Sequence, residues 1–507
     1  MNVYWTDLHS NLHSADVDHA SRWFEHARRI MDFWAIAYYP YALIPLRNGF
    51  KAEGVIDVQT IDADWQKLAD LTQQATQEGF PVFMGYEWQG NGADGDHNVF
   101  FKDQGYPVFP DRYETLKELV MPSPAIAIPH HMAYQPRFRG KNWHTHDSQF
   151  SPFAEVFSSH GSGEDDPVSL PMERHVHMGP RTGVTGLKAG LECGFPIGII
   201  ASGDNHTCPG VHVNGAMAVW APECSKDALW EAMVNRRVYG VSRDHIRLDF
   251  HVDEAWMGSN LDRSEGRTLR VDVEGTDRID RIEILSDRGR LALWSPDESL
   301  QQVSEEHTLR VEFGWGPDRR IFPECVQQVW DGTLHVEGTI TQILPCFNHF
   351  DQRVNQIDSS TLAFSLISTK QNPNDRWMGV GSDLQEGFVV RLKMSPSSHL
   401  VLTVNGHRWI HTIETLCHHS VIHPFLSLAR QRIADQWGDV ALNRRDAWWH
   451  NAPKVKLHRA WSAEDTQFKR SMVLPEGLRY VRVNVVQVNG SVAWSSPIFF
   501  SEGSYGS

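Results

Sequence analysis

The chain has 507 residues, and 47 Lys and Arg against 63 Asp and Glu give it a formal net charge of -16. At roughly 150 residues per domain, this length predicts two or three domains. Charged residues at 22% and aromatic residues at 11% exclude a disordered chain and indicate a globular one. The acidic balance argues against binding a phosphate backbone, so we exclude nucleic acid as a partner, although a local basic pocket could still bind a small anion.

The cysteine content and the hydropathy bear on the compartment. Six cysteines are scattered along the chain without a C-x-x-C pair, so we expect mostly buried, unpaired thiols in a reducing compartment. No apolar stretch approaches about 18 residues, and the first residues lack a basic region followed by an apolar one. We therefore expect no signal peptide, no membrane partner and a cytoplasmic location.

In the first half of the chain, short apolar runs alternate with helical patterns. Continuous apolar runs of about four to eight residues are typical of strands that are buried on both faces. The predicted strands cover 3–5, 31–37, 81–86, 125–129, 154–157 and 196–201. The predicted helices cover 21–30, 62–78 and 227–235.

This alternation predicts an α/β domain over residues 1–245, either a barrel of the TIM type or a doubly wound sheet. His, Glu and Asp follow the ends of the predicted strands. Because the chemistry of barrel enzymes lies at the carboxyl ends of the strands, we favour the barrel.

The second half changes character at about residue 246, where period-two alternation replaces the helical patterns. It predicts a β-rich, sandwich-like domain over 246–507 with one helix near 424–437. Asn489 and Gly490 between two alternating runs predict a type I′ hairpin. The many tryptophans of this half could stack on sugars, but we favour packing in the core and at interfaces.

The strand ends of the first half carry imidazole and carboxylate groups, which are the usual ligands of zinc, manganese and iron. A mixed set without cysteine favours a catalytic over a structural metal site, with one or two divalent ions. The sequence leaves open which of His130 and His131 is a ligand. The candidate ligands are His9, His13, Glu87, His130, His131, His160, Asp204 and His206.

Other residues at the predicted mouth are suited to proton transfer and substrate binding. An imidazole or a phenol there can donate a proton to a leaving group, and we assign this role to His97, His206 and Tyr39. Guanidinium groups bind phosphate or carboxylate through two parallel hydrogen bonds. The predicted substrate contacts are Tyr38, Tyr41, Arg137, Arg139 and Arg181.

Several of these segments occur in the order of the motifs of one family, the PHP (polymerase and histidinol phosphatase) superfamily. The resemblance covers 1–245 and, more weakly, the end of the chain, where it is to large PHP-like proteins with a C-terminal β domain. The first of these segments, 7–16, resembles a D-x-H-x-H type opening motif. The other segments that carry the resemblance are 85–88, 128–131, 142–147, 156–161, 202–206 and 493–497.

The resemblance implies a distorted (β/α)7 barrel with two or three metals and metal-dependent hydrolysis, most often of phosphate esters. The matched residues, in chain order, are the first ligand His9, the third histidine of the opening motif His13, the bridging carboxylate Glu87, the ligands His130 and His160, and the closing pair Asp204 and His206.

Two departures from the family pattern affect the expected number of metals. Asn11 stands where the second histidine of the opening motif is expected, and Tyr-Tyr-Pro-Tyr at 38–41 replaces a Thr-Asp-His motif. Since Asn binds transition metals poorly, we predict one or two ions instead of three.

The sequence therefore predicts a hydrolase that uses a metal-activated water, most often on a phosphoester. The expected substrate is a small molecule that is anionic or derived from a carbohydrate. His9, Glu87 and Asp204 hold one metal in this hypothesis, and His130 and His160 hold a second one that shares Glu87. The alternatives are a hydrolase or lyase of a non-phosphate carbohydrate ester, lactone or glycoside, and a non-catalytic saccharide-binding protein on a degenerate barrel.

Overall fold

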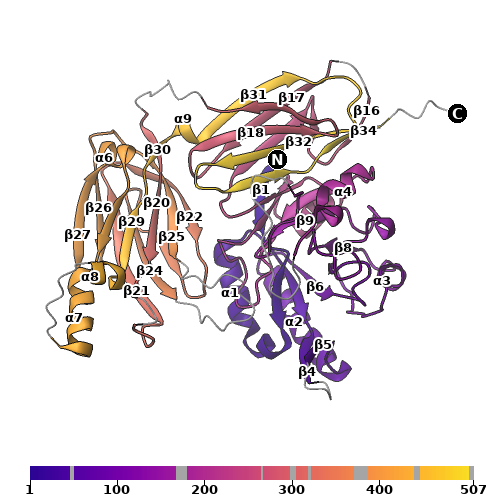
Figure 1. Ribbon diagram of the computed structural model, residues 1–507, viewed down its shortest axis with the longest axis horizontal. Coiled ribbons are helices and arrows are strands. Elements are labelled where there is room, and N and C mark those ends of the chain that lie inside the picture. The colour runs from indigo at the N-terminus through magenta and orange to yellow at the C-terminus, as the bar shows by residue number, and fades with distance from the viewer. Residues whose placement is uncertain are drawn as a thin grey trace. The chain divides into compact units, whose positions relative to one another are not determined.

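The computed structural model describes residues 1–45, 51–166, 180–263, 266–296, 304–317, 321–369, 385–438 and 446–501, and it divides into two compact units (Figure 1). Unit 1 comprises Met1–Gly275, Ile279–Pro296 and Phe468–Ser507, and unit 2 comprises Thr276–Arg278 and Asp297–Gln467. The boundary expected at 245/246 lies inside unit 1.

The strands and helices predicted in the first half are present. The apolar runs form strands because their side chains are buried on both faces, and the periodic segments form helices with one buried side. The strands are β1 (Asn2–Thr6), β3 (Trp34–Tyr39), β6 (Val82–Trp88), β8 (Ala125–Pro129), β9 (Phe153–Ser158) and β11 (Gly198–Ala201). The helices are α1 (Ala20–Ile30), α2 (Val58–Gln77) and α5 (Lys226–Val234).

The first half also contains elements that we did not predict. Some of them extend the sheets, and β4 and β5 form a separate hairpin. These elements are β2 (Ser10–His13), β4 (Tyr41–Pro45), β5 (Lys51–Val55), β7 (His97–Phe101), α3 (Tyr113–Val120), β10 (Gly161–Ser162), α4 (Leu187–Glu192), β12 (Ala216–Ala221) and β13 (Val238–Val241).

Apart from the β4–β5 hairpin, the strands of the first half are distributed over three sheets. One sheet has the order β2-β3-β6-β7-β8, in which β2, β3 and β6 are parallel and β7 is antiparallel to both of its neighbours. A second sheet contains the parallel pair β9 and β11, and β1, β12 and β13 belong to a third. The fold is therefore a strand-rich α/β fold, but the described residues do not form the closed barrel that we expected as one hydrogen-bonded sheet.

The three sheets share one apolar core. It contains side chains from β3, β6, β8, β9, β11 and β12. Representative members are Ala35, Phe83, Ile128, Phe153, Ile200 and Val219. Because these strands surround a common core, the carboxyl ends of β2, β3, β6, β8, β9 and β11 can supply side chains to one site.

The last strands of the chain return to the sheet that contains β1. Its path is β1-β12-β13-β33-β32-β18-β19, and the sheet packs through an apolar core against a second sheet of order β15-β14-β17-β31 (Figure 1). The strands added here are β14 (Arg247–Val252), β15 (Ala255–Trp256), β16 (Asn260–Asp262), β17 (Thr268–Glu274), β18 (Ile279–Ser286), β19 (Gly289–Trp294), β31 (Gln467–Val473), β32 (Tyr480–Gln487), β33 (Val492–Ser495) and β34 (Ile498–Ser501).

Residues of the C-terminal segment form hydrogen bonds with β11 and with the segment after β10. Ser496 Oγ accepts a hydrogen bond from the backbone N–H of Ile199 in β11, at 2.9 Å. Arg482 and the indole N–H of Trp494 donate to the buried carboxylate of Glu164, at 2.6 and 2.9 Å. Buried charge-assisted hydrogen bonds of this kind fix the backbone of the segments they join.

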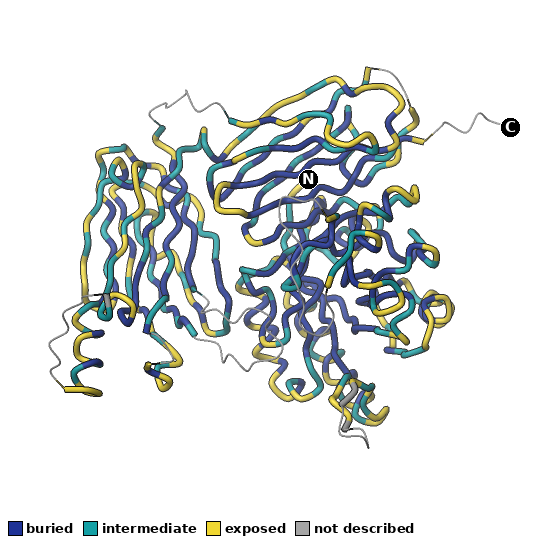
Figure 2. Tube along the Cα trace, viewed as in Figure 1, coloured by how far each residue is buried: buried dark blue, intermediate teal, exposed yellow. Residues whose placement is uncertain are grey.

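Unit 2 is a β-sandwich, as predicted for most of the second half. One sheet has the order β22-β25-β20-β29-β28 with β30 beside β20, and the other has the order β23-β24-β21-β26-β27. Buried aromatic rings such as Phe313 and Trp330, 5.7 Å apart, lie between the sheets, whose inward residues are dark blue in Figure 2.

The strands of unit 2 are β20 (Glu306–Gly314), β21 (Gln327–Val336), β22 (Thr339–Cys346), β23 (Arg353–Gln356), β24 (Thr361–Thr369), β25 (Glu386–Lys393), β26 (His399–Val404), β27 (His407–Thr412), β28 (Val421–Pro424), β29 (Lys454–Leu457) and β30 (Trp461–Ser462). Its helices are α6 (Ile413–His418), α7 (Leu426–Trp437), α8 (Asp446–Asn451) and α9 (Ala463–Thr466). Helix α7 is the helix predicted near 424–437.

Several tryptophans of unit 2 already have packing partners. Trp409 lies between His407 and His423, with ring centroids 5.8 and 4.3 Å away, and the guanidinium of Arg430 lies 4.0 Å from the ring of Trp448. Trp377 lies outside the described residues. The contacts that the structure describes are those expected of packing residues.

Two smaller expectations need correction. Of the six cysteines, none of which is in a disulfide, only Cys208 and Cys346 are buried. The turn at Asn489-Gly490 is not type I′, because that turn needs two neighbouring residues with positive φ and only Gly490 has one, 86°.

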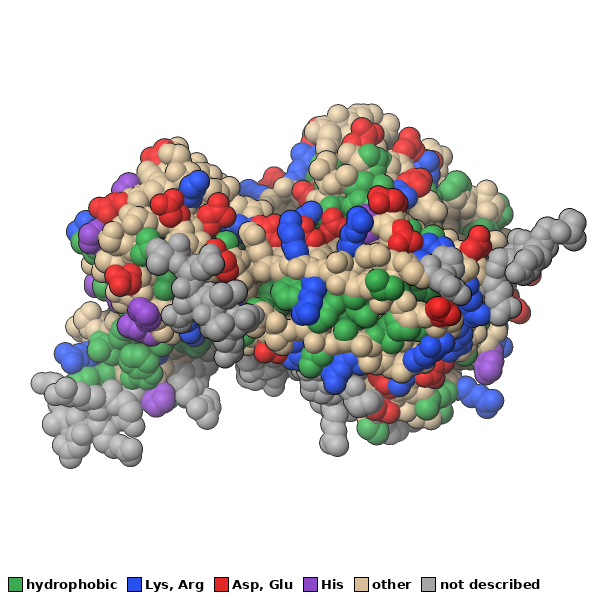
Figure 3. Space-filling model, turned by 90° about the horizontal axis from the view of Figure 1, so that it is seen from above, with side chains coloured by type: hydrophobic (Ala, Val, Ile, Leu, Met, Phe, Trp, Pro, Cys, Tyr) green, Lys and Arg blue, Asp and Glu red, His purple; other side chains and the backbone are tan. Residues whose placement is uncertain are grey.

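Surface charge and helix hydropathy relate to the expectation of no nucleic-acid partner and no membrane partner. Acidic and basic side chains are interspersed on the face seen in Figure 3. None of the helices in the described part of the chain is long and apolar enough to cross a membrane.

Candidate metal centre

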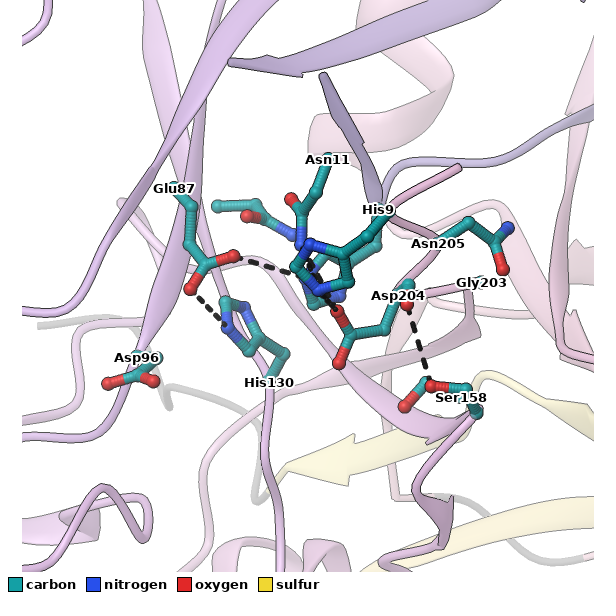
Figure 4. A network of polar contacts seen from close by, with 12 residues as sticks. His9, Asn11, Glu87, Asp96, His130, Ser158, Gly203, Asp204 and Asn205 are labelled. Atoms are coloured by element: carbon teal, nitrogen blue, oxygen red, sulfur yellow. Dashed lines mark hydrogen bonds and ion pairs between the residues drawn. The ribbon is translucent and has the colours of Figure 1, made fainter. Parts of the chain in front are cut away.

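Imidazole and carboxylate groups from several strand ends of unit 1 converge on one buried site (Figure 4). Two groups of potential ligand atoms occur among the described residues, each with all atoms within 4.8 Å of one another. The first group comprises Glu87, Asp96, His130 and His131, and the second comprises His131, His160 and Asp204.

Buried polar atoms without partners identify where an ion would fit. Both ring nitrogens of His130, Nδ1 of His131 and Oδ1 of Asp96 are buried and have no hydrogen-bond partner among the described residues. Buried polar groups are nearly always hydrogen-bonded, and an ion is one explanation for a cluster of exceptions. Imidazole nitrogen and carboxylate oxygen are ligands for divalent transition metals, so these residues fit such an ion.

His9 lies between the two groups, as Figure 4 shows. Its Nε2 is 3.2 Å from Asp204 Oδ1 and 3.6 Å from Glu87 Oε2, and its Nδ1 is 2.8 Å from Glu155 Oε2. Burial alone would lower the pKa of His9, but the carboxylates of Asp204 and Glu155 raise it well above its usual value. A carboxylate on the far nitrogen of a histidine orients the near nitrogen toward a metal.

In contrast to His9, whose raised pKa favours the protonated form, three other candidate ligands have ionisation states that suit metal binding. Burial and the neighbouring His9 lower the pKa of His130 to about 3, and burial with His130 lowers the pKa of His131 well below its usual value. Burial opposes ionisation of Glu87, but His9 and His130 bring its pKa down to about 2. Neutral imidazoles and an ionised carboxylate are therefore present at neutral pH, as metal ligation requires.

Two of the candidate ligands have unusual backbone conformations. His131 has a φ of 54° and Asp204 has a φ of 51°. Left-handed conformations are uncommon for residues with a side chain, and they concentrate at functional sites where the surrounding structure enforces them. His131 lies two residues after the end of β8, and Asp204 lies three residues after the end of β11.

Arg139 contacts the first ligand group. Its Nε and Nη2 donate to Oδ2 of Asp96, and its Nη2 is 3.7 Å from Glu87 Oε1. Burial raises the pKa of Asp96 to about 7, although Arg139 opposes this shift. The guanidinium thus holds Oδ2 of Asp96, which is also 3.7 Å from Nε2 of His131, while the buried Oδ1 has no hydrogen-bond partner among the described residues.

A second set of side chains adjoins Asp204. His206 Nε2 is 3.4 Å from Asp204 Oδ1, and His206 Nδ1 is 2.7 Å from Nε2 of His13. Asn11 donates to Asp204 Oδ1 at 3.1 Å. Burial and His206 lower the pKa of His13 to about 4. The structure brings His13 and His206 next to the ligands, but neither is in the two groups found among the described residues.

The three tyrosines of the Tyr-Tyr-Pro-Tyr segment point to different places. Tyr39 lies over His13 and His206, with ring centroids 4.6 and 5.2 Å away. The Tyr41 hydroxyl donates to the backbone carbonyl of Glu87 at 3.3 Å. Tyr38 donates to Asp64 of α2 at 2.7 Å, because successive residues of β3 face opposite sides of the sheet.

His97 lies on the opposite face of the sheet from Glu87. In the register of β6 and β7, Glu87 pairs with Asn98 and Trp88 pairs with His97, so the two pairs face opposite sides. The ring nitrogens of His97 contact the Gly95 carbonyl and the buried Lys141 Nζ, at 2.9 and 3.2 Å. The structure therefore does not bring His97 to the other candidate residues.

The remaining two arginines lie in different surroundings. Arg181 donates to the backbone carbonyls of His160 and Met132, and its guanidinium lies 4.7 Å from the ring of Tyr134. Arg137 is exposed. Arg181 thus positions the segment that carries His160.

Sequence reasoning missed three residues of this site: Asp96, Glu155 and Tyr134. Glu155 is a carboxylate inside an otherwise apolar strand, and that pattern is a signal that could have identified it. Asp96 precedes a strand instead of following one. Tyr134, 2.9 Å from Nδ1 of His160, has no distinguishing signal in the sequence.

No protein-family model matches the chain. An uncharacterised protein of Chlamydia pneumoniae is 26% identical over an alignment of 192 residues that covers 34% of this chain and 31% of that protein, so the match spans about a third of the relative. A two-domain protein of Bacteroides vulgatus, described as containing a predicted PHP-like metal-dependent phosphoesterase, has a TM-score of 0.34 and 12% identity, covering 81% of this chain and 95% of that one. The major pilin subunit of Bacillus cereus has a TM-score of 0.08 and 8% identity, covering 52% and 68%.

The fold and the site together define a class of protein. The chain is a strand-rich α/β protein with a buried cluster of His, Asp and Glu that fits divalent metal ions.

Proposed function

We propose that the protein is a metal-dependent hydrolase that acts on a phosphoester with water as the nucleophile. The observation that supports this most is the convergence of unpartnered, buried ligand atoms of His130, His131 and Asp96. A catalytic site needs such ligands on several elements around one point, whereas structural zinc sites mostly use cysteine. We also propose that the strands around the common core form the distorted barrel that the motifs suggest.

The ligand groups suggest how one or two ions of zinc, manganese or iron would be held. Glu87, Asp96 and His130 would hold one, and His160 and Asp204 a second, with His9 beside Glu87 and Asp204. His131 lies in both groups but would bind only one of the ions, because a neutral imidazole has a single nitrogen free to bind metal. This division differs from the expected one, in which His160 accompanied His130 and Glu87 was shared. A bound divalent ion supplies a Lewis acid for a phosphoryl oxygen and lowers the pKa of a water ligand.

The side chains around these groups would orient the ligands and move the proton. Glu155 holds Nδ1 of His9, and Tyr134 holds Nδ1 of His160. His206, paired with His13, is our proposed donor of a proton to the leaving group, because it adjoins the ligands without belonging to either group. Tyr39 covers this pair and would orient the substrate.

The substrate class rests on the ordered motifs that resemble those of the PHP superfamily, in which phosphate esters predominate. Arg139 beside the ligands is consistent with a substrate that carries negative charge. The substrate panel described below tests which leaving group the protein accepts.

Metal content tests this proposal. We expect the protein, purified without a histidine tag, to contain about one or two equivalents of zinc, manganese or iron by elemental analysis. His130→Ala and Asp204→Ala remove ligands, so they should lose metal while their circular dichroism spectra stay native. His144→Ala changes an exposed histidine and should keep the metal. Background metal in the unmodified protein would refute the proposal.

Hydrolysis of a panel of substrates tests the reaction. We expect the metal-loaded protein to hydrolyse phosphoesters and to lose activity with a chelator and in Asp204→Ala. Turnover of lactones, carbohydrate esters or glycosides without turnover of phosphoesters would favour the alternative hydrolase or lyase.

A further inference from the structure

The hairpin of β4 and β5 brings an additional carboxylate to the ligand cluster. Glu53 lies in β5, and its Oε1 accepts a hydrogen bond from the Tyr39 hydroxyl at 3.4 Å, while its Oε2 is 3.8 Å from Arg139 Nη1. Its side chain is 26% exposed, so it reaches both the site and the solvent. Glu53 belongs to neither ligand group found among the described residues.

Arg139 is shared among three carboxylates. It donates to Asp96, is 3.7 Å from Glu87 and is 3.8 Å from Glu53. These carboxylates also raise the pKa of Arg139, against the effect of burial. A guanidinium carries one positive charge, so its charge is offset within the protein before an anionic substrate arrives.

Arg181, a second arginine that we expected to bind an anion, also makes its contacts within the protein. Arg181 donates its terminal nitrogens to the carbonyls of His160 and Met132 and stacks on Tyr134. The attraction for a negative substrate must therefore come mainly from bound metal, and Glu53 opposes that attraction at the rim.

We propose that Glu53 is a specificity-determining residue that makes the site favour phosphodiester-like monoanions over dianionic phosphomonoesters. This inference rests on the proposed function and narrows its substrate class. Each additional negative charge on the substrate is repelled by the Glu53 carboxylate, which lies at the rim and is not consumed as a metal ligand. A monoanion meets this repulsion once and a dianion twice.

Anion binding to metal-loaded protein tests the inference without requiring turnover. The probes are inorganic phosphate and dimethyl phosphate, with affinities measured calorimetrically at about pH 8, above the second phosphate pKa of about 6. We expect the unmodified protein to bind dimethyl phosphate at least as tightly as phosphate, despite its lower charge. Glu53→Gln should strengthen phosphate binding about five- to tenfold and change dimethyl phosphate binding less than about twofold.

The controls separate this inference from the proposed function. Glu25→Gln removes a charge from the exposed side of α1 and should change neither affinity. Metal content is measured first for every protein, and the absence of metal from the unmodified protein overturns both proposals. With metal bound, equal changes for both anions, no gain for phosphate, or no binding of either anion overturns the role of Glu53 alone.

Discussion

At the scale of single residues, the metal centre depends on side chains that hold the ligands in one orientation. His9 is fixed by Glu155 on one ring nitrogen and faces Asp204 and Glu87 with the other. His160 is fixed in the same way by Tyr134. Partners of this kind determine which nitrogen faces a metal and how basic it is.

Replacing Glu155 by Gln tests this arrangement. The substitution keeps the size of the side chain but removes the charge that orients His9, so we expect metal affinity to fall about 10- to 100-fold. The measurement is competition with a chelator of known affinity. Glu118→Gln, on the exposed side of α3, is the matched control and should bind metal normally. Unchanged affinity in Glu155→Gln would show that Glu155 does not orient the ligand.

At the scale of elements, the connections after the strands are held together by buried carboxylates. Asp94, in the β6–β7 connection, accepts hydrogen bonds from Arg112, the Tyr113 backbone N–H and Asn142, at 2.8, 3.1 and 3.1 Å. It therefore ties that connection to the start of α3 and to the segment that follows Lys141. Burial disfavours the Asp94 carboxylate, but these donors outweigh it and lower the pKa to about 2.

The pH dependence of stability follows from this shift. Because the folded pKa of Asp94 lies below the usual 3.8, its contribution is complete above about pH 4 and is lost as the pH falls toward 2. We expect Asp94→Asn to lower the free energy of unfolding by about 1–3 kcal/mol at neutral pH. The difference from the unmodified protein should shrink in urea titrations below about pH 4.

Asp103→Asn, at an exposed position of the same unit, is the control and should be nearly neutral at every pH. A deficit in Asp94→Asn that stays constant down to about pH 2 would contradict the assignment.

At the scale of the whole molecule, unit 2 is an insertion into unit 1. The chain leaves unit 1 after Pro296 and returns to it at Phe468. Within unit 1, Trp294 and Phe468 lie on either side of this insertion, and their ring centroids are 6.1 Å apart. A segment whose two ends are neighbours can be removed with little disturbance of the surrounding core.

Excision of residues 297–467 tests this organisation. We expect a chain in which a short Gly-Ser linker joins residues 296 and 468 to fold cooperatively and to retain its metal, since the ligands and the C-terminal strands belong to unit 1. Thermal unfolding by circular dichroism and elemental analysis are the measurements. A chain that instead ends at residue 467 lacks β32–β34 and should fail to fold. If the excised chain showed no cooperative transition, unit 1 would not be independent.

The sequence predicted six strands and three helices of the first half because their apolar patterns are local. It predicted which types of residue follow the strands for the same reason. It did not predict which face of a sheet each side chain occupies or which residues it contacts. The tyrosines of β3 illustrate this: Tyr38 faces α2, and Tyr39 faces the site. The register of β6 and β7 similarly turns His97 away from the face of Glu87. A shift of one residue in a strand exchanges its two faces, and the pairing of distant strands fixes that shift.

The sequence by itself determined the composition of this protein's elements: α/β in the first half, β-rich in the second, with His, Asp and Glu after buried strands. The tertiary structure alone decided which of those side chains meet. It added Asp96 and Glu155 to the site, and it joined the last strands to the sheet of β1 through the pairing of β13 with β33. The physical reason is that hydrophobic periodicity is encoded over a few residues, whereas a buried polar cluster forms only between segments that are far apart in the chain.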